Sequence, residues 1–156
     1  MADLLVKLYG LPPALSAPVG PVAIRPAMAY EKHAVLGWVR THFGEGWASE
    51  CDVAFANRPI ACHIAVEQGA MLGFACYDAT CRGFFGPLGV ADAARRRGIG
   101  RALLLSALYA MSSAGYAYAI IGGTDNAEFY AQAAGAIEIP GSTPGIYRDR
   151  LKALQP

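Results

Sequence analysis

Four arginines and two glycines gather within seven residues of this chain, between an apolar strand-like stretch and the start of a helix-like one. They are Arg95, Arg96, Arg97, Gly98, Gly100 and Arg101. A helix start leaves backbone N–H groups without partners and carries partial positive charge. Glycines let a bulky anion approach that backbone closely. The pattern predicts a polyanion site, and the pyrophosphate of a nucleotide-like cofactor is the ligand it favours.

Two common phosphate loops do not match these residues. A P-loop requires GxxxxGK(S/T), and the sequence contains no such run. A Rossmann fingerprint requires GxGxxG directly after a strand, but the third glycine would fall at Leu103, and several residues separate Val90 from Gly98. Both readings are therefore excluded.

The stretch resembles motif A of the GNAT superfamily of N-acetyltransferases, Gln/Arg-x-x-Gly-x-Gly/Ala, through Arg95, Gly98 and Gly100. Its context is similar too, because an apolar strand ending at Val90 precedes it and a helix follows. The resemblance covers about residues 60–140 of a chain that we expect to form one domain over 1–156. It implies an α/β GNAT-like fold: a mixed, mostly antiparallel central sheet with a splayed parallel strand pair, flanked by helices.

The resemblance also implies a co-substrate, acetyl-CoA, and the residues that hold it. Backbone groups of Leu88, Gly89 and Val90 should face its acyl and pantetheine part, where an N–H can stabilise a tetrahedral oxyanion. The residues expected to form the pyrophosphate loop are Arg95, Arg96, Arg97, Gly98, Ile99, Gly100 and Arg101. Tyr130 corresponds to the tyrosine that protonates the departing CoA thiolate in many family members. The alternative for Tyr130 is a core tyrosine on a short helix.

No general base stands out, since residues 84–90 contain no carboxylate. Glu50, Glu67, Asp78 and His63 remain candidates by loose proximity alone. A histidine in an apolar strand, such as His63, is more often a satisfied core residue.

These observations predict an enzyme that moves an acetyl group from acetyl-CoA to a primary amine by direct attack, through a tetrahedral intermediate. The acceptor, a small molecule or a peptide, is not identified by the sequence. The residues that could form its pocket are Trp47, Phe84, Phe85 and the loop 141–147. The alternative is a non-catalytic acyl-CoA-binding or regulatory module of the same fold. Exposed strand edges would be compatible with a homodimer.

Composition sets further bounds. The 156 residues carry 13 basic and 12 acidic side chains, so the formal net charge of +1 argues against nucleic-acid and membrane partners. The four cysteines form no CxxC pair and only three histidines are present, which argues against a metal site. With no signal peptide pattern, we expect reduced thiols and a cytoplasmic location.

Hydrophobic patterning places the elements. Strands are expected at 4–9, 22–26, 60–66, 71–77, 84–90, 116–121, 137–139 and 146–148, and helices at 27–43, 47–56, 98–112 and 127–134. We expect 4–9 to be an edge strand, 67–70 a hairpin turn and 12–21 a proline-rich crossing. Gly86 and Pro87 predict a bulge in their strand. The charge-free stretch 102–124 is broken by small residues at 112–115, which favours a buried helix and strand over a membrane span.

Overall fold

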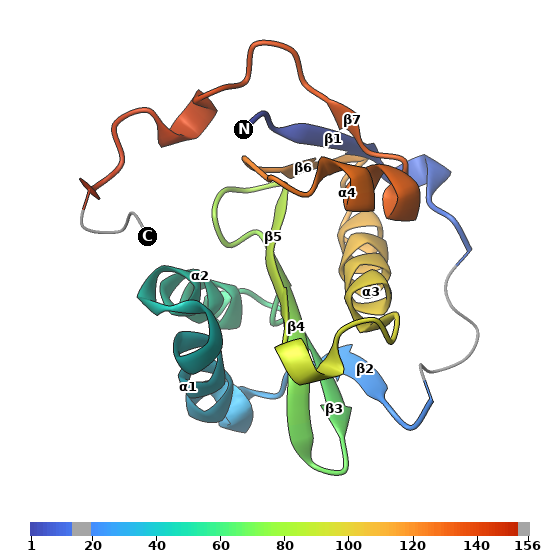
Figure 1. The fold of residues 1–156 in the computed structure, drawn as a ribbon, viewed down its shortest axis with the longest axis vertical. Helices are drawn as coiled ribbons and strands as arrows, with labels where there is room; N and C mark the ends of the chain where they lie inside the picture. The colour runs from blue at the N-terminus through green and yellow to red at the C-terminus, as the bar shows by residue number, and fades with distance from the viewer. Residues whose placement is uncertain (14–19, 153–156) are drawn as a thin grey trace.

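The computed structural model describes residues 1–13 and 20–152, and within them a seven-stranded sheet carries the fold (Figure 1). The strands are Leu4–Lys7 (β1), Ala23–Pro26 (β2), Cys62–Glu67 (β3), Ala70–Tyr77 (β4), Phe84–Val90 (β5), Tyr118–Ile121 (β6) and Ile137–Glu138 (β7). The helices are Lys32–Phe43 (α1), Glu45–Ala56 (α2), Ile99–Ser113 (α3) and Ala127–Ala134 (α4). Figure 1 shows α1 and α2 on one side of β4 and β5, with α3 on the other.

The sheet runs in the order β2-β3-β4-β5-β6-β1-β7, and only the β5–β6 pair is parallel. That pairing joins Phe84 and Phe85 to the end of β6 and goes no further. Directly after it, Gly86 takes a φ of +120° and the β4–β5 register shifts. Pro87 has no N–H to give to a ladder. The predicted bulge and the predicted splay between two parallel strands are therefore confirmed.

Two strand predictions are wrong. The segment expected at an edge, β1, lies inside the sheet between β6 and β7, where Leu4 and Val6 are buried. The sequence does not reveal this position in the sheet, because β1 pairs with strands that lie more than a hundred residues further along the chain. The expected final strand at 146–148 is instead part of a 3-10 helix, Gly145–Tyr147. The expected crossing at 12–21 falls mainly on residues 14–19, outside the described residues.

The charge-free stretch 102–124 divides into the body of α3 and the strand β6. Eight of the fifteen α3 residues are buried, among them Leu103, Leu104 and Leu108. The helix therefore packs its apolar residues against the sheet and shields that face from solvent. Across residues 1–13 and 20–152, no helix is both long enough and apolar enough to cross a membrane. The buried helix-and-strand reading of this stretch is confirmed.

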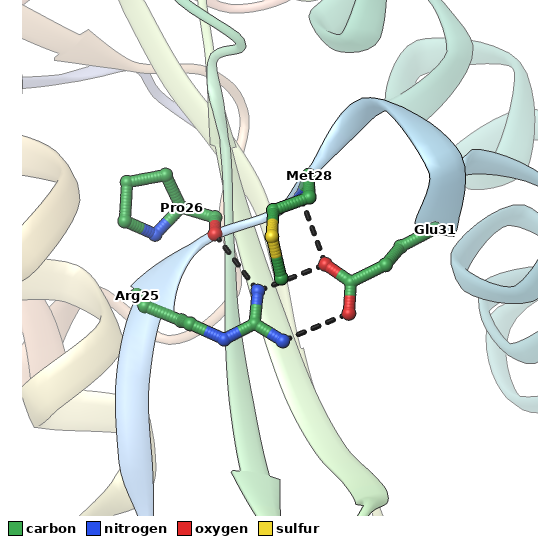
Figure 2. Close-up of polar contacts among 4 residues, drawn as sticks. All are labelled: Arg25, Pro26, Met28 and Glu31. Carbon is green, nitrogen blue, oxygen red and sulfur yellow. Dashed lines mark hydrogen bonds and ion pairs between the residues drawn. The ribbon is translucent and has the colours of Figure 1, made fainter.

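An ion pair fixes the chain where β2 turns into α1 (Figure 2). The guanidinium of Arg25 donates to both carboxylate oxygens of Glu31 at 2.8 Å, and the same carboxylate accepts the N–H of Met28 at 2.8 Å. These bonds hold the pKa of Glu31 well below its usual range, at about 2. The turn lies directly before α1, which begins at Lys32.

Candidate active site

A cleft of about 1360 Å³ opens where β5 and β6 part. The residues that line it come from β5, the first residues of α3, the end of β6, α4, α2 and the segment around 143–150. Every residue predicted to bind the cofactor, except Arg97, lines this cleft, as does Tyr130. One cavity therefore brings together segments that lie far apart in the sequence.

The register of β5 shows which of its N–H groups face the cleft. Ala91 donates its N–H to Leu72 on β4, and β5 pairs residue by residue with β4 from Leu88 to Val90. Because hydrogen-bonded and non-hydrogen-bonded pairs alternate in an antiparallel ladder, the N–H groups of Leu88 and Val90 point away from β4. On that side β6 pairs only with the first two residues of β5. Two backbone donors are therefore presented to the gap.

The loop before α3 leads into a helix N-terminus that is suited to binding an anion. Gly98 has a left-handed φ of +78°, which a residue with a Cβ adopts only at a cost, and no side chain caps the helix. The first turn contains no acidic residue. The N–H groups of Ile99, Gly100 and Arg101 have no partner within the helix, and the helix dipole adds positive charge there.

The arginines divide into two groups. Arg97 forms an ion pair with Glu67 at 2.6 Å, and this contact lowers the pKa of the Glu67 carboxyl. Arg95 forms an ion pair with Asp92, with 3.2 Å between Nη2 of the arginine and Oδ1 of the aspartate. Arg96 and Arg101 line the cleft and make no ion pair with any described residue. Two guanidinium groups are thus left for a ligand, a distinction that the run of arginines in the sequence did not reveal.

Tyr130 lies on α4 with its ring packed edge-on against Phe85 and Phe129, at centroid distances of 6.2 and 5.0 Å. The residue is buried yet lines the cleft, and its hydroxyl has no hydrogen-bond partner among the described residues. Burial, followed by the charge of Asp125, raises the pKa of Tyr130 to about 12. The phenol is therefore protonated throughout the neutral range and can donate a hydrogen bond into the cleft.

Three of the four candidate bases lie outside the cleft. Glu67 is held in its ion pair, and the Asp78 carboxylate accepts the hydroxyl of Tyr116 at 2.9 Å. The Nδ1 of His63 lies 2.6 Å from the Ser106 hydroxyl in the core, and burial lowers the pKa of His63 to about 4. His63 is a satisfied core histidine, as its apolar surroundings in the sequence indicate.

Glu50, on α2, is the candidate base that lines the cleft. One of its carboxylate oxygens accepts the hydroxyl of Thr80, from the loop after β4. Burial raises the pKa of Glu50, an effect that the bond from Thr80 only partly offsets. A carboxylate that is partly desolvated in a cleft is suited to accept a proton near neutral pH.

Aromatic side chains line the same cleft as Glu50. Trp47, one helical turn earlier, stacks on Phe43 with ring centroids 4.9 Å apart. Tyr147 reaches the cleft because Gly122, at the end of β6, has no side chain, and a Cβ there would overlap the Tyr147 hydroxyl. The expected acceptor pocket is thus partly assembled: Trp47, Phe85 and the 141–147 loop line the cleft, whereas Phe84 does not. Sequence reasoning missed Thr80, Gly122 and Arg150, whose positions carry no local motif.

The cysteines behave differently from what their spacing suggests. The sulfurs of Cys51, Cys62 and Cys76 all lie within 4.8 Å of one another in the core, although the sequence separates them. Cys51 Sγ is 3.7 Å from Cys62 Sγ, and burial raises the pKa of the Cys76 thiol. The spacing of the cysteines in the sequence is therefore not sufficient to argue against a metal site, because β3, β4 and α2 bring three thiols together.

Among the described residues, the mixed sheet opens at its parallel strand pair, and a helix N-terminus without a side-chain cap lies at the opening. The sequence profile of the Acetyltransferase (GNAT) family matches residues 28–135, so the chain belongs to that family. No curated protein matches the sequence.

Solved structures share this fold. A GCN5-related N-acetyltransferase from Sphaerobacter thermophilus superposes with a TM-score of 0.71 at 21% identity, over 88% of this chain and 48% of its own. A GCN5-related glucosamine N-acetyltransferase region of a fungal multi-domain β-N-acetylglucosaminidase gives 0.71 at 13% identity, over 88% and 19%. The GNAT family N-acetyltransferase YhbS from Escherichia coli, in complex with CoA, gives 0.56 at 18% identity, over 76% and 71%. The chain spans about half or less of the first two.

Proposed function

We propose that this protein is an acetyl-CoA-dependent N-acetyltransferase that acts on a primary amine. One observation carries the proposal: a single cleft contains a bare helix N-terminus, two unpaired strand N–H groups and a half-buried carboxylate. These are the groups needed to hold a diphosphate, stabilise an oxyanion and accept a proton. The CoA complex of the similarly folded YhbS supports the choice of CoA.

In this proposal backbone N–H groups make the main contacts to acetyl-CoA, and arginine side chains add to them. The N–H groups at the start of α3, after Gly98, hold the pyrophosphate, and Arg96 and Arg101 add charge-assisted bonds. Leu88 offers its N–H to the pantetheine arm, and Val90 directs its own toward the thioester carbonyl. Gly100 adds no side chain to this surface, and a Cβ there would meet Val90 and Phe129 at ordinary contact distances of 3.7 and 3.8 Å.

Glu50 then accepts a proton from the acceptor's ammonium group, directly or through one water. The free amine attacks the thioester carbon, a C–N bond forms, and the Val90 N–H stabilises the resulting oxyanion. The attacking nitrogen is positively charged in this intermediate and releases its extra proton to solvent, and the C–S bond breaks with its electron pair going to sulfur. The amide leaves, and the thiolate receives a hydrogen bond from Tyr130.

The pKa of Tyr130 defines its part in this step. At about 12 it lies above the reference value of a thiol, about 8.5, so a complete proton transfer from Tyr130 to the sulfur would be uphill. Tyr130 therefore acts as a hydrogen-bond donor that lowers the barrier to C–S cleavage. The proton that ends on the thiol comes from solvent or from protonated Glu50.

Two measurements test the proposal. Thermal unfolding with acetyl-CoA at a hundredfold excess over its dissociation constant should show stabilisation by about 2.7 kcal/mol. Release of free thiol should then follow when a panel of primary amines is added. Stabilisation without thiol release from any amine would favour the alternative, a non-catalytic acyl-CoA-binding module, and no stabilisation would refute both.

A further inference from the structure

The acceptor end of the cleft carries one negative and one positive side chain. Glu50 comes from α2, and Arg150 follows the 3-10 helix Gly145–Tyr147. The other charged residues that line the cleft, Arg95, Arg96, Arg101 and Asp125, lie at the start of α3 or just before α4. Arg150 makes no ion pair with any described residue.

Tyr147 links the two charges. Its phenol lines the same cleft, and its pKa is raised by burial and by negative groups that include Glu50, while Arg150 lowers it. Both charges are therefore within electrostatic reach of one aromatic ring. Trp47 provides a second aromatic wall beside Glu50. An acceptor that enters this end meets a carboxylate, a guanidinium and two flat apolar surfaces.

We infer that the acceptor is an amino carboxylate with an apolar or aromatic side chain, whose ammonium group pairs with Glu50 and whose carboxylate pairs with Arg150. This inference rests on the proposed acetyltransferase function. A guanidinium presents two parallel N–H groups that match a carboxylate, which an amine without an anionic group would leave unused. A polycationic acceptor would place additional positive charge beside Arg150. The aromatic walls accommodate an apolar side chain.

The test uses matched acceptors that differ only in the carboxylate. Each amino acid is compared with its own amide, and the amino acids are L-phenylalanine, L-tryptophan, L-leucine and L-methionine. The reaction rate is measured as the release of free thiol from acetyl-CoA, and mass spectrometry identifies the acetylated product. The quantity measured is the ratio of kcat/KM for the acid to that for the amide. The amides contain the more readily deprotonated amine, so a preference for the acid requires recognition of the carboxylate.

The variants are Arg150→Met and Arg150→Glu, with Arg148→Met as the control because Arg148 is exposed like Arg150 but does not line the cleft. We expect the wild-type ratio to exceed one for at least one pair. Arg150→Met should lower that ratio about fivefold or more, as for the loss of one partly solvated bidentate pair. Arg150→Glu should invert the preference, and Arg148→Met should leave the ratio unchanged.

The outcomes separate the two proposals. Thiol release with an acid-to-amide ratio that Arg150→Met does not alter overturns the amino-carboxylate inference and leaves the acetyltransferase function standing. The same holds if the amides are preferred throughout. Absence of thiol release with every acid, every amide and a wider panel of amines, in a protein that acetyl-CoA stabilises, refutes the acetyltransferase function and this inference with it.

Discussion

The two ends of the cleft are built differently. The end proposed to bind the cofactor (the cofactor end) comes from one continuous stretch, β5 to the start of α3, and it offers mainly backbone N–H groups. The end proposed to bind the acceptor (the acceptor end) comes from α2, the loop after β4 and the segment around Tyr147, and it offers mainly side chains. A backbone site requires particular conformations over a short stretch, whereas a side-chain site requires only that distant segments meet. The comparison predicts that each end can be disabled while the other still works.

The largest effect should come from filling the cofactor end. Replacing Gly100 with leucine should weaken CoA binding about a hundredfold or more, because the side chain would occupy the space in front of the helix N-terminus. Gly100→Ala is the control, since its Cβ would meet only ordinary contacts at 3.7 and 3.8 Å. Calorimetric titration with CoA measures both. Equal affinities for the two variants would contradict the loop assignment.

Glu50→Gln should show the opposite pattern at the acceptor end. We expect CoA binding to persist while kcat/KM for the amine falls about a hundredfold, as for loss of a general base. Because burial raises the pKa of Glu50, its basic form accumulates only above the ordinary range of a carboxyl group. Wild-type kcat/KM should therefore rise with pH through that raised pKa.

The pH–rate profile of Glu50→Gln should lack this rise. Glu45→Gln is the matched control on the same helix, where Glu45 pairs with exposed Arg40 at 3.0 Å. A Glu50→Gln enzyme with wild-type turnover would remove Glu50 from the mechanism.

Tyr130 lies where the two ends meet, and its loss should have an intermediate effect. Tyr130→Phe keeps the ring packed against Phe85 and Phe129 but removes the hydrogen bond to the departing sulfur. We expect turnover to fall about tenfold or more with little change in cofactor affinity. Since the phenol pKa is about 12, no limb of the pH profile below pH 10 should disappear. Equal turnover in the two proteins would assign Tyr130 to the core alone.

Gly89 lies on β5 at the cofactor end and packs against Phe43 at the acceptor end. A Cβ there would lie 2.6 Å from the ring of Phe43, which carries the stack on Trp47 at the acceptor wall. Gly89→Ala should lower the free energy of unfolding by about 1–3 kcal/mol through overpacking. Urea unfolding measures this, with Gly37→Ala as the control, because a Cβ at Gly37 would meet nothing within 4 Å. Equal destabilisation by both substitutions would contradict the packing argument.

The smallest effect should come from the turn that orients α1. Glu31→Gln should lower the free energy of unfolding by about 1 kcal/mol at pH 7, as for a bidentate pair near the surface. The pKa of Glu31 is depressed to about 2 in the folded protein, so the contribution is complete above the unfolded value near 4.5. It is lost as the pH falls through about 2. A difference between wild type and variant that stays the same at pH 2 and pH 7 would exclude this ion pair as its source.

The elements of the central part of the chain could be predicted because their signals are local. The spacing of Arg95, Gly98 and Gly100, the two apolar runs on either side of the turn at 67–70 and the Gly86–Pro87 break each report a backbone conformation over a few residues. The position of β1 could not be predicted, because pairing with β6 and β7 depends on contacts across more than a hundred residues. The expected strand at 146–148 failed for a related reason, since short apolar runs do not distinguish a strand from a 3-10 turn.

The amino-acid sequence alone determined the family, the glycine-bearing loop and the broken strand, because glycine and proline restrict or free the backbone wherever they stand. Only the tertiary structure decided which arginines line the cleft, which of the candidate carboxylates lines it, and that three thiols meet in the core. These choices depend on charge partners and burial, which exist only once α2, β4 and the C-terminal segment have packed together.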